Sequence, residues 1–139
     1  MNKQLPWVYI ASPLSKGNYA WNVNYSVKVF TKLLDEKKCI PYTPLSSVLS
    51  DMICPIDYNG WLYYDLALLE RFDILLRLNT KINKSKIGCN SKNTSYNMKK
   101  SLGADREEKR FKDLDKPIVY SIKELYALID RTKILNPRF

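Results

Sequence analysis

The feature that most constrains the fold is the alternation of short apolar runs with amphipathic segments along almost the whole chain. Four runs have the length and composition of β-strands, at residues 7–12, 39–44, 73–78 and 117–120. Apolar residues recur at helical spacing over residues 24–38, 61–71 and 121–131, and residues 101–113 are expected to form a helix that opens on Ser-Leu-Gly. Such alternation is typical of a parallel sheet covered by helices on both faces. The sequence therefore predicts an α/β, doubly wound, Rossmann-like fold with a mainly parallel sheet of four or five strands.

Two local expectations accompany this prediction. Asn22 or Asn24 is expected to cap the first helix, because asparagine is a favoured N-cap residue and apolar residues at helical spacing follow it. Residues 45–60, which include Pro55 and Gly60, are expected to form a long connection between the second strand and the second helix.

Length and composition indicate one soluble domain. The chain has 139 residues, of which 45% are hydrophobic and 27% charged, close to the averages for globular proteins. No apolar stretch approaches the ~20 residues that cross a bilayer, and the amino terminus lacks the apolar run of a signal peptide. We expect a single cytoplasmic domain over residues 1–139, with no membrane partner.

The formal net charge of +9 suggests an anionic ligand or partner. Six lysines lie within residues 79–100, a stretch without acidic residues that is rich in Asn and Ser and reads as a basic loop insertion. This segment is either a plain surface loop or a flap that attracts phosphate. Nucleic acid is the least favoured partner, because the lysines lack the interleaved aromatic residues of a stacking platform.

The absence of histidine excludes more kinds of catalytic and metal site than any other feature of the composition. Without it the chain cannot build a Ser-His-Asp or Cys-His nucleophile, or the usual histidine-containing zinc site. The three cysteines are scattered and form no Cys-x-x-Cys pair. We therefore expect no metal and no cofactor, with carboxylates performing any acid or base chemistry.

Candidate site residues follow the carboxyl ends of the expected strands, where ligands of this architecture bind. Residues able to cradle a phosphate follow the first strand: Ser12, Ser15, Lys16, Gly17 and Asn18. A turn without a ligand would have the same composition. A second group opens the helix expected at residues 101–113, where free N–H groups favour an anion: Ser101, Gly103 and Glu107. Acidic residues early in a helix are also ordinary capping chemistry.

Asp65 is the third candidate. It lies on a mostly apolar helix face, where a carboxylate must find a partner or incur a desolvation cost. It is therefore either a buried structural hydrogen-bonding group or a functional acid.

These segments resemble one known family. The chain is similar to the nucleoside 2-deoxyribosyltransferase-like superfamily, above all to its small bacterial and phage members. The similar segments are Tyr9-Ile-Ala-Ser-Pro-Leu-Ser-Lys-Gly17, Pro41-Tyr-Thr-Pro-Leu45, Trp61 with Asp65 and Asp73, Ser101-x-Gly-x-x-x-Glu107 and Pro117-Ile-Val-Tyr120. One departure is the insertion at residues 79–100, which is longer than the loop usual before the Ser-x-Gly-x-x-x-Glu motif.

The resemblance implies a mechanism. Glu107 would attack the anomeric carbon of a sugar, Tyr9 would orient that glutamate, and Asp65 would contact the departing base as an acid. Ser101 at the head of the motif resembles the related deoxynucleoside monophosphate N-glycoside hydrolases, whereas transferases of free nucleosides tend to carry aspartate there. The sequence thus predicts an N-glycosidase of nucleoside 5′-monophosphates, with base exchange and nucleotide binding without catalysis as the alternatives.

We also expect self-association, as a homodimer or a larger homo-oligomer. The chain has ten tyrosines and three tryptophans, more aromatic surface than one small core readily buries. The helices expected over residues 24–37 and 61–71 are the predicted contact surfaces.

Overall fold

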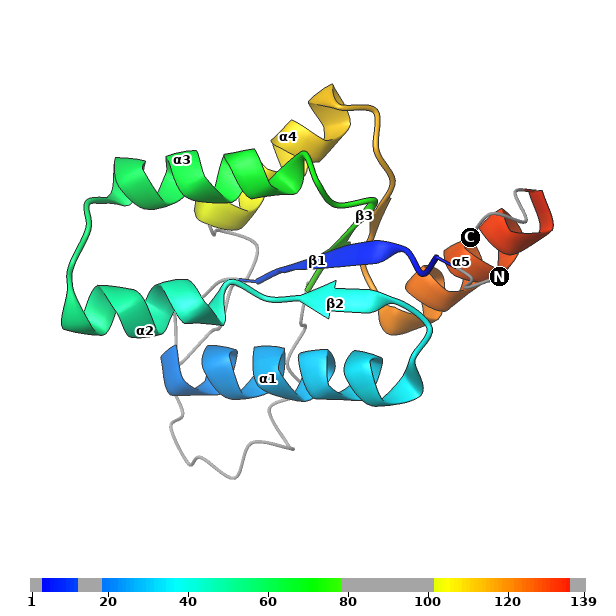
Figure 1. The fold of residues 1–139 in the computed structure, drawn as a ribbon, viewed down its shortest axis with the longest axis horizontal. Helices are drawn as coiled ribbons and strands as arrows, with labels where there is room; N and C mark the ends of the chain where they lie inside the picture. The colour runs from blue at the N-terminus through cyan, green and yellow to red at the C-terminus, as the bar shows by residue number, and fades with distance from the viewer. Residues whose placement is uncertain (1–3, 13–18, 79–101, 136–139) are drawn as a thin grey trace, which may run out of the picture.

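Four parallel strands form the central sheet, in the order β2-β1-β3-β4 (Figure 1). The computed structural model describes residues 4–12, 19–78 and 102–135. Within them the strands are β1 (Trp7–Ala11), β2 (Ile40–Tyr42), β3 (Ile74–Arg77) and β4 (Ile118–Val119). Each lies inside a run predicted as a strand. The predicted α/β, doubly wound fold is confirmed.

Helices connect the strands, and two expectations about them were wrong. The helices of the described residues are α1 (Tyr19–Glu36), α2 (Leu45–Ile53), α3 (Tyr58–Leu69), α4 (Leu102–Asp113) and α5 (Ile122–Leu135). Asn22 and Asn24 lie within α1, because that helix begins at Tyr19, and Asn22 is buried there.

The expected long connection contains all of α2 and the start of α3. The apolar residues of α2 follow the helical spacing i, i+3, i+4, i+7, i+8, which the interspersed serines obscured: Leu45, Val48, Leu49, Met52 and Ile53.

The two faces of the sheet are covered by different helices (Figure 1). Successive strand residues point to opposite faces, so Val8 and Ile10 of β1 pack with residues of α1 and α5. Tyr9 and Ala11 point the other way, into a second cluster with Leu69, Phe72, Ala104 and Phe111 from α3, α4 and the turn after α3. Residues 8–11 of β1 are all buried, as expected of a central parallel strand.

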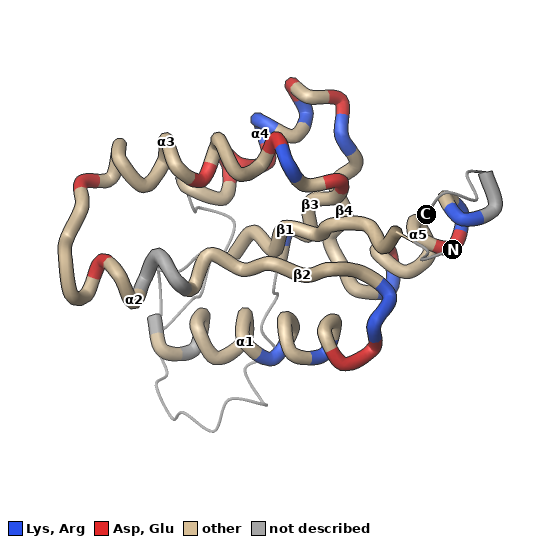
Figure 2. The backbone as a smooth tube through the Cα atoms, viewed as in Figure 1, with Lys and Arg blue, Asp and Glu red and all other residues tan. Residues whose placement is uncertain are grey.

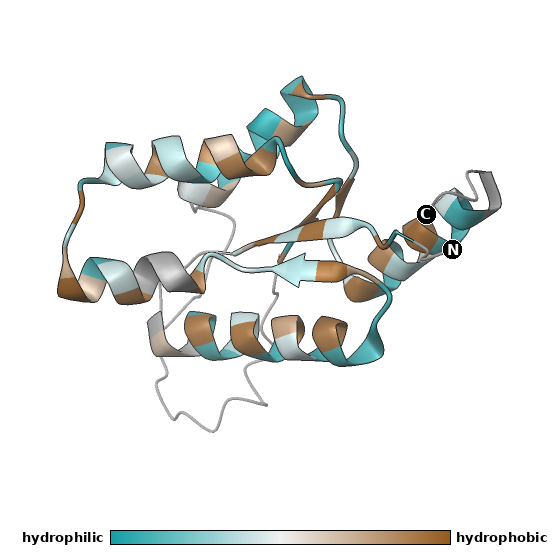
Figure 3. Ribbon diagram, viewed as in Figure 1, coloured by the Kyte–Doolittle hydropathy of each residue, from teal (hydrophilic) through white to brown (hydrophobic). Residues whose placement is uncertain are grey.

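Large apolar side chains are exposed on α2, α3 and the turn between them. They are Leu49, Met52, Ile53, Ile56, Tyr58, Tyr63 and Tyr64. Figure 3 shows hydrophobic residues at the end of α2 that lies away from the sheet. No helix among the described residues is long and apolar enough to cross a membrane.

Candidate functional site

A buried hydrogen bond joins β1 to α4. The hydroxyl of Tyr9 donates to Oε1 of Glu107 over 2.8 Å, although the two residues are 98 positions apart in the chain. Tyr9 is fully buried, and Glu107 is only 6% exposed. The central strand and α4 thus bring together two of the residues that the sequence analysis singled out.

The spacing of residues along α4 explains why Glu107 points inward. Ala104, Glu107 and Phe111 stand at i, i+3 and i+7, which places them on one face of a helix, and all three are buried. Glu107 therefore occupies a position that an apolar residue would ordinarily fill. Burying a carboxyl group is costly, so such a placement indicates a functional group.

Burial dominates the electrostatics of Glu107. Desolvation raises the pKa of Glu107 to about 8, while the Tyr9 hydrogen bond and the charge of Arg77 oppose the rise and the charge of Asp65 adds to it. The pKa of Tyr9 is raised well above its ordinary value, first by burial and then by the nearby Glu107. Tyr9 therefore stays a hydrogen-bond donor at neutral pH.

Asp65 reaches the same site from α3. It is the only charged residue between Tyr58 and Leu69, and Figure 2 shows α3 as mostly uncharged beside the alternating charges of α4. Its Oδ1 is buried and has no hydrogen-bond partner among the described residues, and burial raises the pKa of Asp65 to about 6. The charge of Asp65 acts on both Tyr9 and Glu107, so the three groups form one electrostatic unit.

Aromatic rings hold Tyr9 in place. The ring centroids of Tyr42 and Phe72 lie 5.5 and 5.4 Å from that of Tyr9, and they are 5.3 Å from each other. Such tilted and edge-on contacts fix the ring plane of a tyrosine. The direction of the Tyr9 hydroxyl is therefore set before any ligand binds.

The phosphate-binding candidates are only partly described. The Oγ atoms of Ser12 and Ser26 lie 2.6 Å apart, so Ser12 is engaged with α1, on the sheet face opposite Tyr9. Gly103 lies in the first turn of α4, and a Cβ there would meet nothing within 4 Å. The remaining candidates lie outside the described residues: Ser15, Lys16, Gly17, Asn18, Ser101 and the basic insertion at residues 79–100.

Arg77 is a site residue that the sequence analysis did not identify. It ends β3, is 2% exposed, and donates from Nη2 to Oδ1 of Asp105 over 2.9 Å. A charged residue inside the apolar run at residues 73–78 was the signal that could have revealed it, because a buried guanidinium requires anionic partners.

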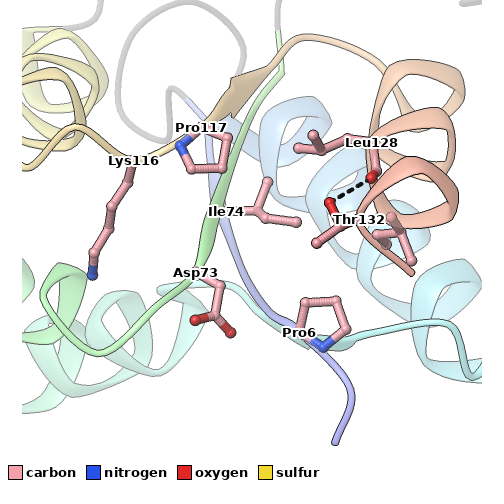
Figure 4. Close-up of a pocket in the computed structure, with 8 residues that line it drawn as sticks. Pro6, Asp73, Ile74, Lys116, Pro117, Leu128 and Thr132 are labelled. Atoms are coloured by element: carbon pink, nitrogen blue, oxygen red, sulfur yellow. Dashed lines mark hydrogen bonds between the residues drawn. The ribbon is translucent and has the colours of Figure 1, made fainter. Parts of the chain in front are cut away.

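A separate cavity of about 290 Å³ opens at the amino ends of the strands (Figure 4). Its lining is mostly apolar and includes Ile74, Leu128 and Ile129. Its charged residues are already engaged, since Lys116 donates to the carbonyls of Glu70 and Phe72 and a carboxylate oxygen of Asp73 accepts from the Trp7 N–H. The groups suited to catalysis lie instead around Glu107.

Comparisons of the chain with protein-family models, curated proteins and solved structures found no significant match. Family membership therefore rests on the sequence motifs and stays a prediction. Among the described residues, no three His, Cys, Asp or Glu side chains are grouped so as to hold a metal ion. The groups that the structure brings together at the site are carboxylates, a tyrosine hydroxyl and a guanidinium.

We predict that the free energy of unfolding falls as pH rises from about 5.5 to 8. The unfolded chain releases the Glu107 proton near the ordinary pKa of 4.5, whereas the folded protein keeps it until about pH 8. The folded state thus binds more protons in this window, and one such group contributes a slope of up to ~1.4 kcal/mol per pH unit. Urea unfolding at several pH values measures the slope.

The variant Glu107→Gln should flatten this dependence, because glutamine carries no titrating proton. Asp113→Asn, at the exposed end of the same helix, should keep it. An equal slope in the parent and in Glu107→Gln would contradict the assignment.

A second prediction concerns Gly103. Glycine within a helix costs ~0.5 to 1 kcal/mol relative to alanine, and the added methyl group of Gly103→Ala meets no described atom. Chemical denaturation should show unchanged or higher stability. If a ligand approaches the first turn of α4, calorimetry should at the same time show weaker binding of nucleoside monophosphates. Unchanged affinity would place Gly103 outside the binding surface.

Proposed function

We propose that the protein is an N-glycosidase that cleaves the bond between base and sugar in a nucleoside or deoxynucleoside 5′-monophosphate. The observation that carries this proposal is the buried Glu107 carboxyl group, oriented by Tyr9 and electrostatically coupled to Asp65. A carboxylate nucleophile and a carboxylic acid suffice to break a glycosidic bond without histidine or metal. The site contains both kinds of group.

The first step forms a covalent intermediate. At neutral pH the proton shared by the two carboxyl groups favours Glu107, so it first passes to Asp65. The ionised carboxylate of Glu107 then attacks the anomeric carbon, the bond to the base nitrogen breaks with its electron pair, and the base takes the proton from Asp65. The product is a glycosyl ester of Glu107 and a free base. The Tyr9 hydroxyl holds the glutamate so that the other carboxylate oxygen can face the sugar.

The second step decides between hydrolysis and transfer. Water attacks the anomeric carbon and gives a proton to the ionised Asp65, which releases the sugar phosphate and restores the Glu107 carboxylate. If a second base attacks instead and gives its proton to Asp65, the product is a new nucleoside monophosphate, and the enzyme is a deoxyribosyltransferase. The two reactions share the intermediate and differ only in which acceptor reaches it.

Support for the 5′-phosphate comes from the sequence. Ser101 at the head of the motif can donate to a phosphate, and the N–H groups at the start of α4 favour an anion. The basic insertion at residues 79–100 and the loop containing Ser15, Lys16, Gly17 and Asn18 provide further donors and positive charge. The cytoplasmic location expected from the sequence is part of this proposal, since nucleotides are abundant there.

A panel of nucleosides and nucleoside monophosphates, assayed by chromatography for free base, tests the proposal. Release of base from monophosphates alone supports it. Exchange of bases without hydrolysis favours the transferase. Tight binding of a monophosphate without turnover favours the alternative of a nucleotide-binding module and contradicts the enzyme.

We predict that Glu107→Gln lowers turnover by orders of magnitude while ligand affinity changes little. Glutamine keeps the size and hydrogen bonding of the side chain but has no nucleophilic carboxylate. Steady-state kinetics and calorimetry measure the two effects. Asp113→Asn on the same helix is the control and should turn over at the parent rate, and a Glu107→Gln variant with parental turnover would exclude the glycosyl ester.

We further propose that the chain forms a homodimer or a larger homo-oligomer through exposed apolar side chains of α1 and α3. Leu34 and Tyr63 are among these, and Tyr63 is 79% exposed. Burial of one such side chain contributes ~1.5 to 3 kcal/mol, so Tyr63→Glu should weaken association about tenfold or more. Light scattering with a dilution series measures this, and a parent protein that stays monomeric at high micromolar concentration would contradict it.

A further inference from the structure

Arg77 lies on the same face of the sheet as Tyr9. It pairs with Ala11 in the register between β1 and β3, two positions beyond the pair of Tyr9 with Leu75. Side chains two positions apart on a strand share a face, so Arg77 points toward α4. Its side chain is almost fully buried there.

The two partners of Arg77 flank Glu107 in the chain. Nη2 lies 2.9 Å from Oδ1 of Asp105, and Nη1 lies 3.5 Å from Oε2 of Glu108. Asp105 precedes Glu107 by two residues and Glu108 follows it by one. A hydrogen bond to Asp105 and an ion pair with Glu108 thus connect the rigid guanidinium to α4 on either side of the glutamate that meets Tyr9, although Nη1 forms no hydrogen bond among the described residues.

We propose that Arg77 is a positioning residue, which fixes the rotation of α4 on the sheet so that Glu107 faces the Tyr9 hydroxyl. The inference rests on the proposed function for the role of Glu107 as a nucleophile. It concerns how the chain orients that nucleophile, and it can be tested without a substrate.

Apolar packing alone does not fix this rotation well. The other buried residues on this face of α4 are Ala104, which is small, and Phe111, which lies one turn beyond Glu107. Hydrophobic burial is non-directional, whereas adjacent residues of a helix are turned by about 100°. A modest rotation of α4 would move the Glu107 carboxyl group away from Tyr9, and the two-point contact with Arg77 opposes it.

The contacts of the Arg77 guanidinium are all with α4. Nη2 hydrogen-bonds to Asp105 and Nη1 lies 3.5 Å from Glu108, while Nε and Nη1 have no hydrogen-bond partner among the described residues. Glu108 itself accepts hydrogen bonds from Tyr120 and Lys112. Because both carboxylates beside the guanidinium belong to α4, Arg77 acts through that helix.

A double-mutant cycle on the pKa of Glu107 tests the proposal. The pKa is read from the side-chain ¹³C carboxyl resonance by NMR, in the parent, Tyr9→Phe, Arg77→Met and the double variant. Tyr9→Phe should raise the pKa, because the Tyr9 hydrogen bond lowers it. If Arg77 positions Glu107, the same change should have less than half that effect in the Arg77→Met background.

The competing explanation is that Arg77 acts only through its charge. Arg77→Met would then raise the pKa of Glu107, but the effect of Tyr9→Phe would be the same in both backgrounds. Such additivity would overturn the proposal. Lys112→Met is the matched control, because Lys112 contacts Glu108 from the exposed side of α4, and it should leave the effect of Tyr9→Phe at its full size.

Arg77→Lys keeps the proposal testable should Arg77→Met fail to fold. Lysine retains the charge but lacks the planar fork that spans two carboxylates, so the effect of Tyr9→Phe should again shrink. A full effect in Arg77→Lys would overturn the proposal. A parent protein without turnover would refute the proposed enzyme, while the titration would still decide the role of Arg77.

Discussion

The hydrogen bond between Tyr9 and Glu107 is the contact on which the site depends. It links β1, a central strand of the sheet, to α4 and compensates part of the cost of burying a carboxyl group. The Tyr42 and Phe72 rings fix its donor, and the packing of α4 together with its contacts to Arg77 presents its acceptor. Both partners are thus held by the core, and the site is organised before any ligand arrives.

The pair of Glu107 and Asp65 has a chemical consequence of its own. Burial raises the pKa of both carboxyl groups, to about 8 and about 6, so near neutral pH the pair holds about one proton. Cleavage of a glycosidic bond needs one ionised carboxylate and one proton for the leaving base. The pair holds one proton and one negative charge, as the proposed reaction requires. A bound base that draws the proton toward Asp65 would leave Glu107 ionised for attack.

The fold could be predicted from the sequence because strand-length and helix-length patterns alternate clearly, and β1, β3 and α4 lie inside their predicted ranges. The helix α2 was missed because serines break up its apolar spacing. The resemblance to a known family pointed to Glu107, Tyr9 and Asp65, and their catalytic roles stay predictions. Arg77 could not be assigned from the sequence, because its partners on α4 lie 28 or more positions away and only the folded chain brings them together.

The site divides its groups between two helices. Glu107 belongs to α4, which contacts Tyr9 and Arg77 of the sheet. Asp65 belongs to α3, where most side chains are at least partly exposed. Substitutions at the exposed positions of α3 therefore alter the surroundings of Asp65, whereas the Tyr9–Glu107 hydrogen bond involves no side chain of α3. Such a division would let descendants of this chain acquire different groups around Asp65 while they inherit the buried Glu107 and its contacts unchanged.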